Sequence, residues 1–451
     1  MNPGPTLHVF AGPTLAADRI RALAATAIVH PPVQHGDLLR LAARRGDIVL
    51  IIDGLWHQVP PVRHKEILEL LANDVRVVGA ASMGALRAAE LAPYGMIGVG
   101  WVYQQYATGQ LDADDEVAVT QTPSGAPLST ALVCLRYRLN AAADAGAITA
   151  GEAAQLVELA RALPYQRRSW KALHYAAAST DLAGACQRAV DWNDHYGETA
   201  DIKAVDAELA LTFAATGHLP EPADQPGWQQ QPWRTSHLRS WAATYRPVAI
   251  ANGARVPLTA LLHHAQLYDP HWPERWRRHV LAWIASLPTD TASRLTAPAL
   301  EDQALAAAHH RGLHLDSLTR AQVQHWATPS EISELSPREI LLRLVTRSAR
   351  LDPTASVWPE TPQQARALLD LDAHARAAVH AWTTSQKIAA TGPGRIPAHL
   401  DPTRIRRQLA DHWNLDTADS AALTAAARDR GILSIQEAVE TARPFYLAAR
   451  R

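Results

Sequence analysis

The sequence of 451 residues has few of the residue types that mark several common classes of protein. Two cysteines, Cys134 and Cys186, lie far apart and form no CxxC pair, so neither a disulfide framework nor a zinc ribbon is indicated. No apolar run approaches the roughly 18 residues of a membrane span. The amino terminus has neither the basic nor the apolar region of a secretory signal. We therefore expect a soluble, cytoplasmic protein with no membrane partner.

An excess of charge of either sign is also missing. With 43 Lys and Arg residues against 44 Asp and Glu residues, the formal net charge is −1. This balance argues against non-specific nucleic-acid binding, which requires a basic surface. Lysine is scarce, because only four of the 43 basic residues are lysines. Lys65 and Lys203 therefore stand out as candidate functional cations, since a lysine ammonium is a compact charge whose pKa shifts readily on burial.

The first hundred residues alternate between short apolar runs and amphipathic segments. Strands and helices are expected in turn at about residues 7–10, 15–25, 28–29, 36–45, 47–52, 64–72, 75–78 and 82–91. The run at 47–52 is almost wholly apolar, as in a strand that is covered on both faces. The alternation predicts an α/β fold with a parallel, Rossmann-like sheet and right-handed crossovers.

Helical periodicity replaces this alternation from about residue 130. Helices are expected at 132–143, 151–163, 169–178 and 201–213, followed by a stretch rich in Pro, Gly and Gln that has the composition of a linker. We expect an α/β core at 1–130, a helical extension at 131–215, a linker at 216–234 and an all-helical domain at 235–451. Trp272, Trp276 and Trp283 recur near helical spacing there and are expected to pack in a core.

The strongest local signal lies at residues 77–87. A β-branched strand enters a turn of small residues, and Ser82 follows where the next helix begins. Such a turn lifts a hydroxyl above the carboxyl edge of a sheet, where the backbone amides of Met83 and Gly84 could stabilise an oxyanion. Ser82 could instead be only a helix N-cap, or the turn could bind an anion without a covalent step. The spacing G-x-x-S-x-G differs by one residue from the hydrolase elbow, so that family is not implied.

Other polar residues are expected near the same edge. Asp53 ends the strongest strand and His57 follows it, and ligands of open α/β sheets favour this edge. Further candidates are titratable residues on predicted helices, namely His64, Lys65, Glu66, Arg87, Glu90, Lys203 and Asp206. Each has a structural alternative, such as a helix-start acid or a surface ion pair. No HExxH, P-loop or G-x-G-x-x-G motif is present, so we expect no metal and no cofactor.

These residues lie in segments that resemble the TfuA-like family. The most specific segment is GAASMGALRAAEL at residues 79–91, and others lie at 10–15, 30–37, 52–55, 64–68, 95–100, 114–118, 165–170 and 202–207. The resemblance covers about residues 6–215 and does not extend beyond the linker. It implies an accessory protein that works with a YcaO-family enzyme, which activates a backbone amide with ATP for conversion into a thioamide.

The resemblance further implies sulfur delivery, in which sulfide is released from a thiocarboxylated carrier protein and a ribosomally made precursor peptide is modified. Roles for single residues follow from local chemistry alone. A thiocarboxylate carbonyl needs a nucleophile or an activated water, for which Ser82 is the candidate, with His64 as base and Asp53 as its orienter. Lys65 and Arg87 would hold the departing anion. The rival hypothesis is a non-catalytic adaptor that binds and activates its YcaO partner.

Overall fold

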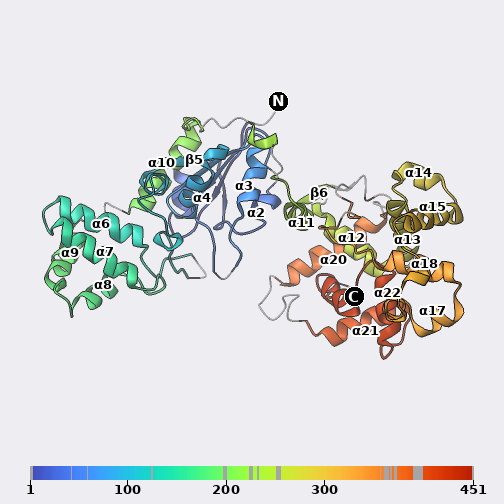
Figure 1. Cartoon of the computed structure of the whole chain (residues 1–451). Coiled ribbons are helices and arrows are strands. Elements are labelled where there is room, and N and C mark those ends of the chain that lie inside the picture. Colours follow the sequence, from blue (N-terminus) through green and yellow to red (C-terminus); the bar gives the residue numbers. More distant parts are fainter. Residues whose placement is uncertain are drawn as a thin grey trace. The chain divides into compact units, whose positions relative to one another are not determined.

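The computed structural model describes residues 4–41, 43–57, 59–122, 125–196, 201–222, 227–230, 233–249, 255–355, 357–359, 365, 368–369, 373–389 and 400–448. The chain divides into two compact units (Figure 1), an amino-terminal unit at Met1–Trp233 and a carboxyl-terminal unit at Arg234–Arg451.

A five-stranded parallel sheet forms the centre of the amino-terminal unit. Its strands lie in the order β2-β1-β3-β4-β5 and are β2 (Ile28–His30), β1 (Leu7–Phe10), β3 (Ile48–Ile51), β4 (Arg76–Ala80) and β5 (Ile97–Val99). The chain winds outward in both directions from the neighbouring strands β1 and β3, which is the doubly wound arrangement. The predicted parallel α/β fold is confirmed. β5 went unpredicted because three residues with a central glycine carry no strand pattern.

Helices cover both faces of this sheet. On one face lie α1 (Ala17–Leu23) and α10 (Ile202–Thr216), and on the other lie α2 (Asp37–Arg40), α3 (His64–Leu71) and α4 (Met83–Leu91). α5 (Trp101–Ala107) follows β5 and packs against α4 and α10. The four residues of β3 are all apolar because both faces of this central strand are buried.

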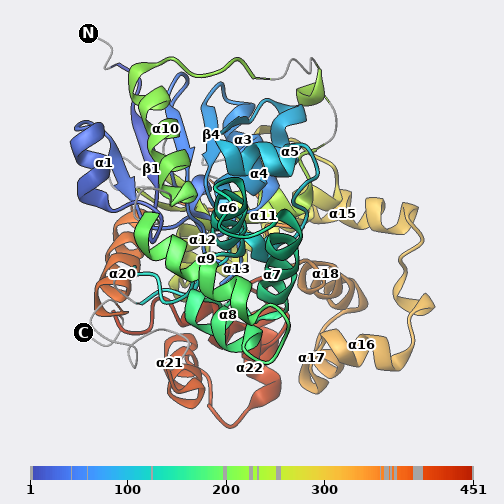
Figure 2. The ribbon, with the colours of Figure 1, turned by 90° about the vertical axis from the view of Figure 1, so that its left-hand side faces the viewer.

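A separate helical bundle interrupts the α/β layers. α6 (Leu132–Asp144), α7 (Ala150–Ala162), α8 (Trp170–Ala177) and α9 (Ala183–Tyr196) enclose a core of their own. The chain then returns to the sheet, where α10 lies beside α1 (Figure 2) and buries Ala207 and Leu211. The structure thus groups α10 with the α/β core rather than with the helical extension. An apolar helix has the same sequence period in either place, so periodicity alone does not assign it.

The carboxyl-terminal unit is mainly helical. Its α-helices are α11 (Ser236–Tyr245), α12 (Leu258–Tyr268), α13 (Trp272–Ile284), α14 (Thr289–Arg294), α15 (Ala297–His310), α16 (Arg320–Trp326), α17 (Pro329–Glu334), α18 (Pro337–Arg347), α20 (Ala373–Ala389), α21 (Pro402–Trp413), α22 (Ser420–Arg428) and α23 (Ile435–Ala442). Trp272 and Trp276 are fully buried in its core, as predicted. The prediction is wrong for Trp283, which lies on the same helix but is 46% exposed. The expectation of an all-helical region is wrong at β6 (Pro247–Ala249) and β7 (Arg255–Pro257), an antiparallel pair too short to show a period of two.

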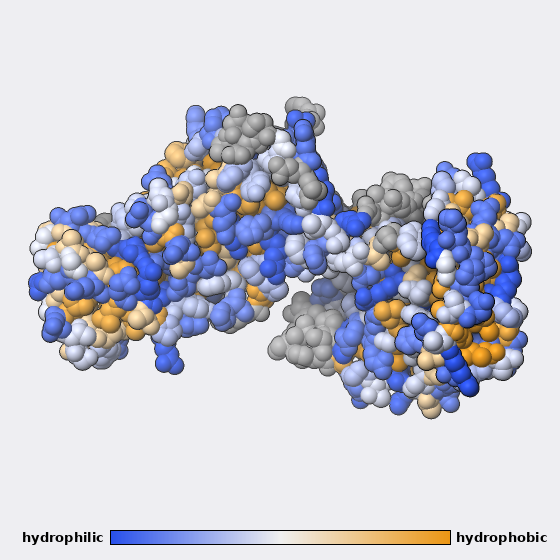
Figure 3. All heavy atoms as spheres, in the orientation of Figure 1, coloured by the Kyte–Doolittle hydropathy of each residue, from blue (hydrophilic) through white to orange (hydrophobic). Residues whose placement is uncertain are grey.

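The surface of the molecule is mixed in character. On the face seen in Figure 3, polar residues (blue) surround scattered patches of apolar residues (orange) on both units. Among the helices in the described part of the chain, none combines the length and the apolarity needed to traverse a bilayer.

Candidate functional site

A cavity of about 250 Å³ lies at the carboxyl edge of the sheet. Its wall is formed by residues that follow β1, β3 and β4, by the segment 114–121, and by Tyr165 and Gln166. β1 and β3 are the strands at which the winding direction reverses, and ligands of doubly wound sheets bind at that switch point. The cavity therefore occupies the expected ligand position of the fold.

Ser82 reaches this cavity from a tight turn after β4. Ala81 has a φ of +65°, a left-handed conformation that strains any residue with a Cβ. Close packing of α4 on the sheet fixes the turn, because a Cβ at Gly84 would lie 1.8 Å from the Ile51 carbonyl oxygen. A Cβ at Gly79 would likewise lie 2.0 Å from the Gly84 carbonyl oxygen. Only glycine fits both positions, which explains the small-residue pattern of this segment.

The Ser82 side chain is buried but forms no capping hydrogen bond with α4. The residue occupies the N-cap position of α4, yet its side chain accepts no hydrogen bond from the helix. Its exposed fraction is 7%, and within the described residues its hydroxyl has no hydrogen-bond partner. Placement alone thus matches the N-cap alternative, while the bond that gives an N-cap its stabilising effect is missing. The hydroxyl remains available to a molecule in the cavity.

The two candidate oxyanion donors differ. The Gly84 amide donates to the Ile52 carbonyl at 3.2 Å, so it is occupied in this conformation. The Met83 amide forms no backbone hydrogen bond within the described ranges, and Met83 lines the cavity. Met83 is therefore the better placed of the two donors.

The Asp53 carboxylate binds a neighbouring loop. One oxygen accepts the Gly12 and Thr14 amides at 2.8 and 3.0 Å, and the other accepts the Thr14 hydroxyl at 2.6 Å. The carboxylate lines the cavity and is almost fully buried, and these three donors compensate its charge. No hydrogen bond joins it to His64 among the described residues. Its visible role is to hold the loop after β1 against the end of β3.

His57 is the histidine that lines the cavity. It has a φ of +73°, so strained backbone occurs on both sides of the site, at His57 and at Ala81. Its ring meets Tyr165 edge-on at a centroid distance of 6.0 Å and Trp56 at 6.1 Å. Sequence reasoning included His57 but missed Trp56 and Tyr165, although Tyr165 opens one of the segments with family resemblance.

His64, Arg87 and Glu90 form a cluster outside the cavity wall. His64 Nε2 lies 2.8 Å from Glu90 Oε2, and Arg87 Nη1 donates to the same oxygen at 2.5 Å. Burial raises the pKa of Glu90, but these two bonds outweigh that effect and lower the pKa overall. The structure therefore brings these three predicted residues together, but it does not bring them to Ser82.

Glu66 and Lys65 lie outside the cavity wall as well. The buried Glu66 carboxylate accepts hydrogen bonds from the Gly36 and Arg63 amides and lies 2.6 Å from His35 Nδ1. Burial raises the pKa of Glu66, and the bond with His35 opposes the shift. Glu66 caps α3 and ties it to the loop after β2. The half-buried Lys65 is its neighbour on the same helix.

Lys203 and Asp206 are buried anchors on α10. Lys203 Nζ donates to the Val117 carbonyl at 3.1 Å. Asp206 accepts the Trp101 and Val102 amides at 2.9 and 2.7 Å, so it caps the start of α5 from a distant helix. Burial raises the pKa of Asp206 to about 6, although these two bonds oppose the shift. Lys203 thus supports the cavity wall through Val117, which lines the cavity, whereas Asp206 holds α5, whose residues are outside the lining.

A buried arginine that sequence reasoning missed holds another wall of the site. Arg168 has no exposed surface and binds the Asp115 side chain at 2.9 Å and the Asp115 carbonyl at 3.1 Å. It also donates to the carbonyls of Ala160 and Leu163. The acidic segment around Asp115 is thus partly paired, since Glu116 also binds Arg136 at 2.7 Å. In a chain so rich in arginine, composition does not mark Arg168. The signal that could have found it is its place in the segment 165–170, which carries family resemblance.

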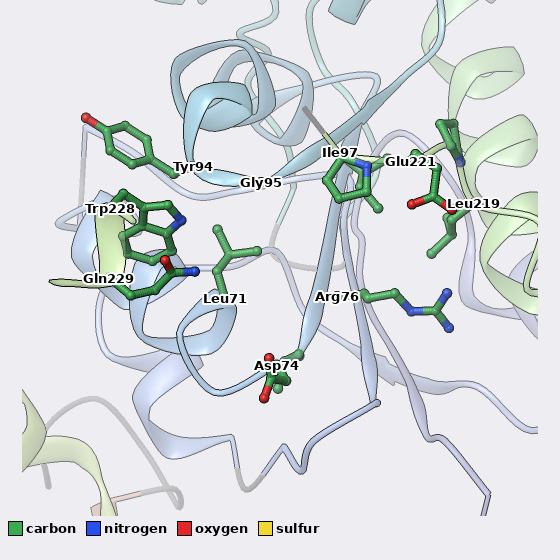
Figure 4. A pocket seen from close by; sticks show the side chains of 13 residues that line it. Leu71, Asp74, Arg76, Tyr94, Gly95, Ile97, Leu219, Glu221, Trp228 and Gln229 are labelled. Carbon is green, nitrogen blue, oxygen red and sulfur yellow. The ribbon is translucent and has the colours of Figure 1, made fainter. Parts of the chain in front are cut away.

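A larger cavity of about 700 Å³ opens at the opposite edge of the sheet, where β4 and β5 begin. Tyr94 and Trp228 lie on one side of it, and Arg76 and Glu221 lie on the other (Figure 4). The residues that follow α10 form part of its wall. Ligands of doubly wound sheets bind at the other edge, so the Ser82 cavity is the better candidate. Among the described residues, no group of three His, Cys, Asp or Glu side chains could hold a metal ion.

The part of the chain that matches a known family includes most of the Ser82 cavity. Residues 53–169 match the family described as TfuA-like protein. This span begins at Asp53, includes Ser82 and the segment 114–121, and ends after Tyr165, so it contains most of the cavity wall. No curated protein matches the sequence. Residues 53–169 of the amino-terminal unit are thus similar to the TfuA-like family.

Proposed function

We propose that this chain is an accessory protein for backbone thioamidation of a ribosomally made peptide by a YcaO-family enzyme. In this proposal it releases sulfide from a thiocarboxylated carrier protein at the Ser82 cavity. The similarity to the TfuA-like family supports the accessory role in making thioamidated peptides. The observation that carries the catalytic part is the buried Ser82 hydroxyl, which lies in a strained turn at the ligand edge and makes no capping bond.

The residues of the cavity suggest a sequence of steps. Ser82 Oγ attacks the thiocarboxyl carbon while its proton passes to His57, and the Met83 amide stabilises the tetrahedral oxyanion. Cleavage of the carbon–sulfur bond releases sulfur, which takes the proton from His57 and leaves as hydrosulfide. Water then hydrolyses the acyl-serine. One thiocarboxylate anion and one water yield one carboxylate, one hydrosulfide and one proton.

This assignment replaces His64 with His57 as the base. A base must lie within hydrogen-bond reach of the proton that it takes, directly or through one water. His57 lines the same cavity as Ser82, whereas His64 binds Glu90 outside the cavity wall. Asp53 then supports the site by fixing the loop after β1 rather than by orienting the base.

The test is sulfide release from a thiocarboxylated carrier by the purified protein without any YcaO enzyme. We expect Ser82→Ala to slow release by about 10²–10⁴-fold, the usual loss when a nucleophile is removed. Ser179→Ala, a change in the exposed turn after α8, is the matched control and should release sulfide at the normal rate. Equal rates for the wild-type protein and Ser82→Ala would refute a nucleophilic serine.

A non-catalytic adaptor is the second candidate. One observation favours it: among the described residues, neither Lys nor Arg lines the Ser82 cavity, so a departing anion meets no permanent cation there. The adaptor predicts no sulfide release by the protein alone. It also predicts that Ser82→Ala stimulates thioamidation as well as the wild-type protein when free sulfide is supplied to the YcaO mixture.

A further inference from the structure

The segment 119–121 presents unpaired backbone groups along the wall of the Ser82 cavity. Gln121 and Pro127 face each other in an antiparallel bridge, which is closed by hydrogen bonds from Leu128 to Thr120 and from Thr122 to Ala126. In such a bridge the central pair does not exchange hydrogen bonds, so the Gln121 N–H and C=O point away from the 126–128 segment. Val119, two residues earlier, has the same orientation in an extended chain.

Within the described ranges, these backbone groups have no hydrogen-bond partners. Among the described residues, the backbone N–H groups of Val119 and Gln121 make no hydrogen bond, whereas Thr120 between them donates to Ser129 Oγ at 2.8 Å. The Gln121 side-chain oxygen is also buried without a partner, next to Gly12. A buried polar group without a partner costs free energy, so the Gln121 side-chain oxygen favours a molecule that supplies a donor. The partly exposed backbone groups of Val119 and Gln121 can pair with the same molecule. Donors and acceptors at every second residue match an extended peptide.

The size of the cavity narrows the class of occupant. Its volume of about 250 Å³ lies below the ~300–1,000 Å³ of most small-molecule and cofactor sites. At about 30 Å³ per water molecule, it holds roughly eight waters, which corresponds to two or three small residues of a peptide. The narrow end of an extended chain fits this space.

We propose that the segment 119–121 takes the carboxyl-terminal tail of the sulfur-carrier protein as an added strand and so directs the tail's last carbon to Ser82. Val119 and Gln121 pair with alternate residues of the tail, and the Gln121 side-chain oxygen accepts one further N–H. Gln121 is thus a positioning residue for the carrier. This proposal rests on the proposed sulfide release for the identity of the carrier, but the binding that it predicts does not require catalysis.

The test uses the full-length protein and a synthetic peptide, Ala-Val-Ala-Val-Gly-Gly with a free carboxylate and a fluorescent label at its amino end. Peptides that are N-methylated at one position each are compared by fluorescence anisotropy. Methylation of an amide that pairs with the edge should weaken binding about 10-fold, and methylation of its neighbours should have little effect. An alternation with a period of two is expected, and its absence would overturn strand addition.

A second arm addresses Gln121 and the source of the tail. Gln121→Leu should weaken binding of the unmethylated peptide about 5-fold, whereas Gln155→Leu, an exposed position on α7, should not change it. The same sequence followed by six further residues should bind more weakly, because the cavity accepts a chain end. Equal binding of the extended peptide would overturn the assignment of a terminal tail. Alternating binding without sulfide release would leave this proposal standing and refute the catalytic one.

Discussion

At the scale of single residues, Gly84 determines how closely α4 approaches the sheet. Gly84→Ala would place a methyl group 1.8 Å from the Ile51 carbonyl oxygen and 3.3 Å from Gly79 Cα. Both neighbours are backbone atoms, so the helix must move outward. We expect the free energy of unfolding to fall by about 3 kcal/mol or more, measured by urea denaturation.

Gly151→Ala provides the matched control for this substitution. Gly151 lies in the first turn of α7, where an added Cβ meets only Thr149 Oγ1 at 4.0 Å. Alanine in an accessible helical position favours folding by about 0.5–1 kcal/mol relative to glycine. Equal stability changes for the two variants would show that α4 does not pack on β3 as described.

Asp206 gives a pH-dependent prediction. Its pKa of about 6 in the folded protein exceeds the ordinary aspartate pKa of 3.8. The stabilisation that its proton provides is therefore complete below pH ~4 and is lost as the pH rises through 6. Two pKa units correspond to about 3 kcal/mol. The stability difference between the wild-type protein and Asp206→Ala should therefore shrink between pH 4 and pH 7. Chemical denaturation of both proteins across this pH range measures the stability difference. A stability difference that does not change with pH would contradict the raised pKa.

The rarity of lysine and helical spacing drew attention to Lys203 and Asp206 as candidate site residues. In the structure, both side chains bind backbone groups of distant segments. Lys203 donates to the Val117 carbonyl, and Asp206 accepts the Trp101 amide. A single sequence shows that such side chains are unusual, but it does not show their partners about 85 to 105 residues away. The Ser82 turn was predictable because its strand, small residues and helix are adjacent in the chain.

At the scale of elements, the 3-10 helix at Asp114–Glu116 joins the helical bundle to the cavity wall through Arg168. Arg168→Met removes four hydrogen bonds from a buried site and leaves the Asp115 carboxylate unpaired. We expect a loss of about 2–4 kcal/mol of stability, together with weaker sulfide release, because Asp114 and Val117 line the cavity next to this contact.

Arg167→Met controls for the loss of a positive charge at the neighbouring position. Arg167 is exposed, and exposed charges contribute little to stability. Thermal unfolding and the sulfide assay, run on both variants, separate the loss of the buried contact from the loss of a positive charge alone. Similar results for Arg167→Met and Arg168→Met would show that the buried contact does not support the site.

The elements also differ in how far the sequence predicted them. β1, β3 and β4 were predicted because each is a local apolar run, and strand–helix alternation predicted the parallel sheet. The position of α10 was not predicted, since its partners lie on strands more than a hundred residues earlier in the chain. Helical period reports which face is apolar, and it carries no information on what covers that face.

At the scale of the whole molecule, the hydrophobic cores are separate. Each core cluster of the described residues draws its members from one unit, and the largest cluster lies wholly within the carboxyl-terminal unit. We expect a fragment of residues 1–233 to fold and to unfold in one transition, at the temperature of the corresponding transition in the full chain.

Calorimetry of the fragment and the full chain checks this prediction. The full chain should show two transitions, and the fragment should show the one that belongs to the amino-terminal unit. Sulfide release by the fragment, measured alongside, reports whether the Ser82 cavity needs residues 234–451. A fragment that fails to unfold cooperatively would show that the two units depend on each other for folding.

The return of α10 to the sheet has a consequence for synthesis on the ribosome. β5 ends at Val99, while α10 spans Ile202–Thr216, so more than a hundred residues must be translated before α10 joins α1 on one sheet face and completes its cover. At about 5–20 residues per second, part of that face stays open on the nascent chain for roughly 5–20 s. Apolar strand surface exposed for so long invites aggregation, which makes this domain a candidate client of ribosome-associated chaperones.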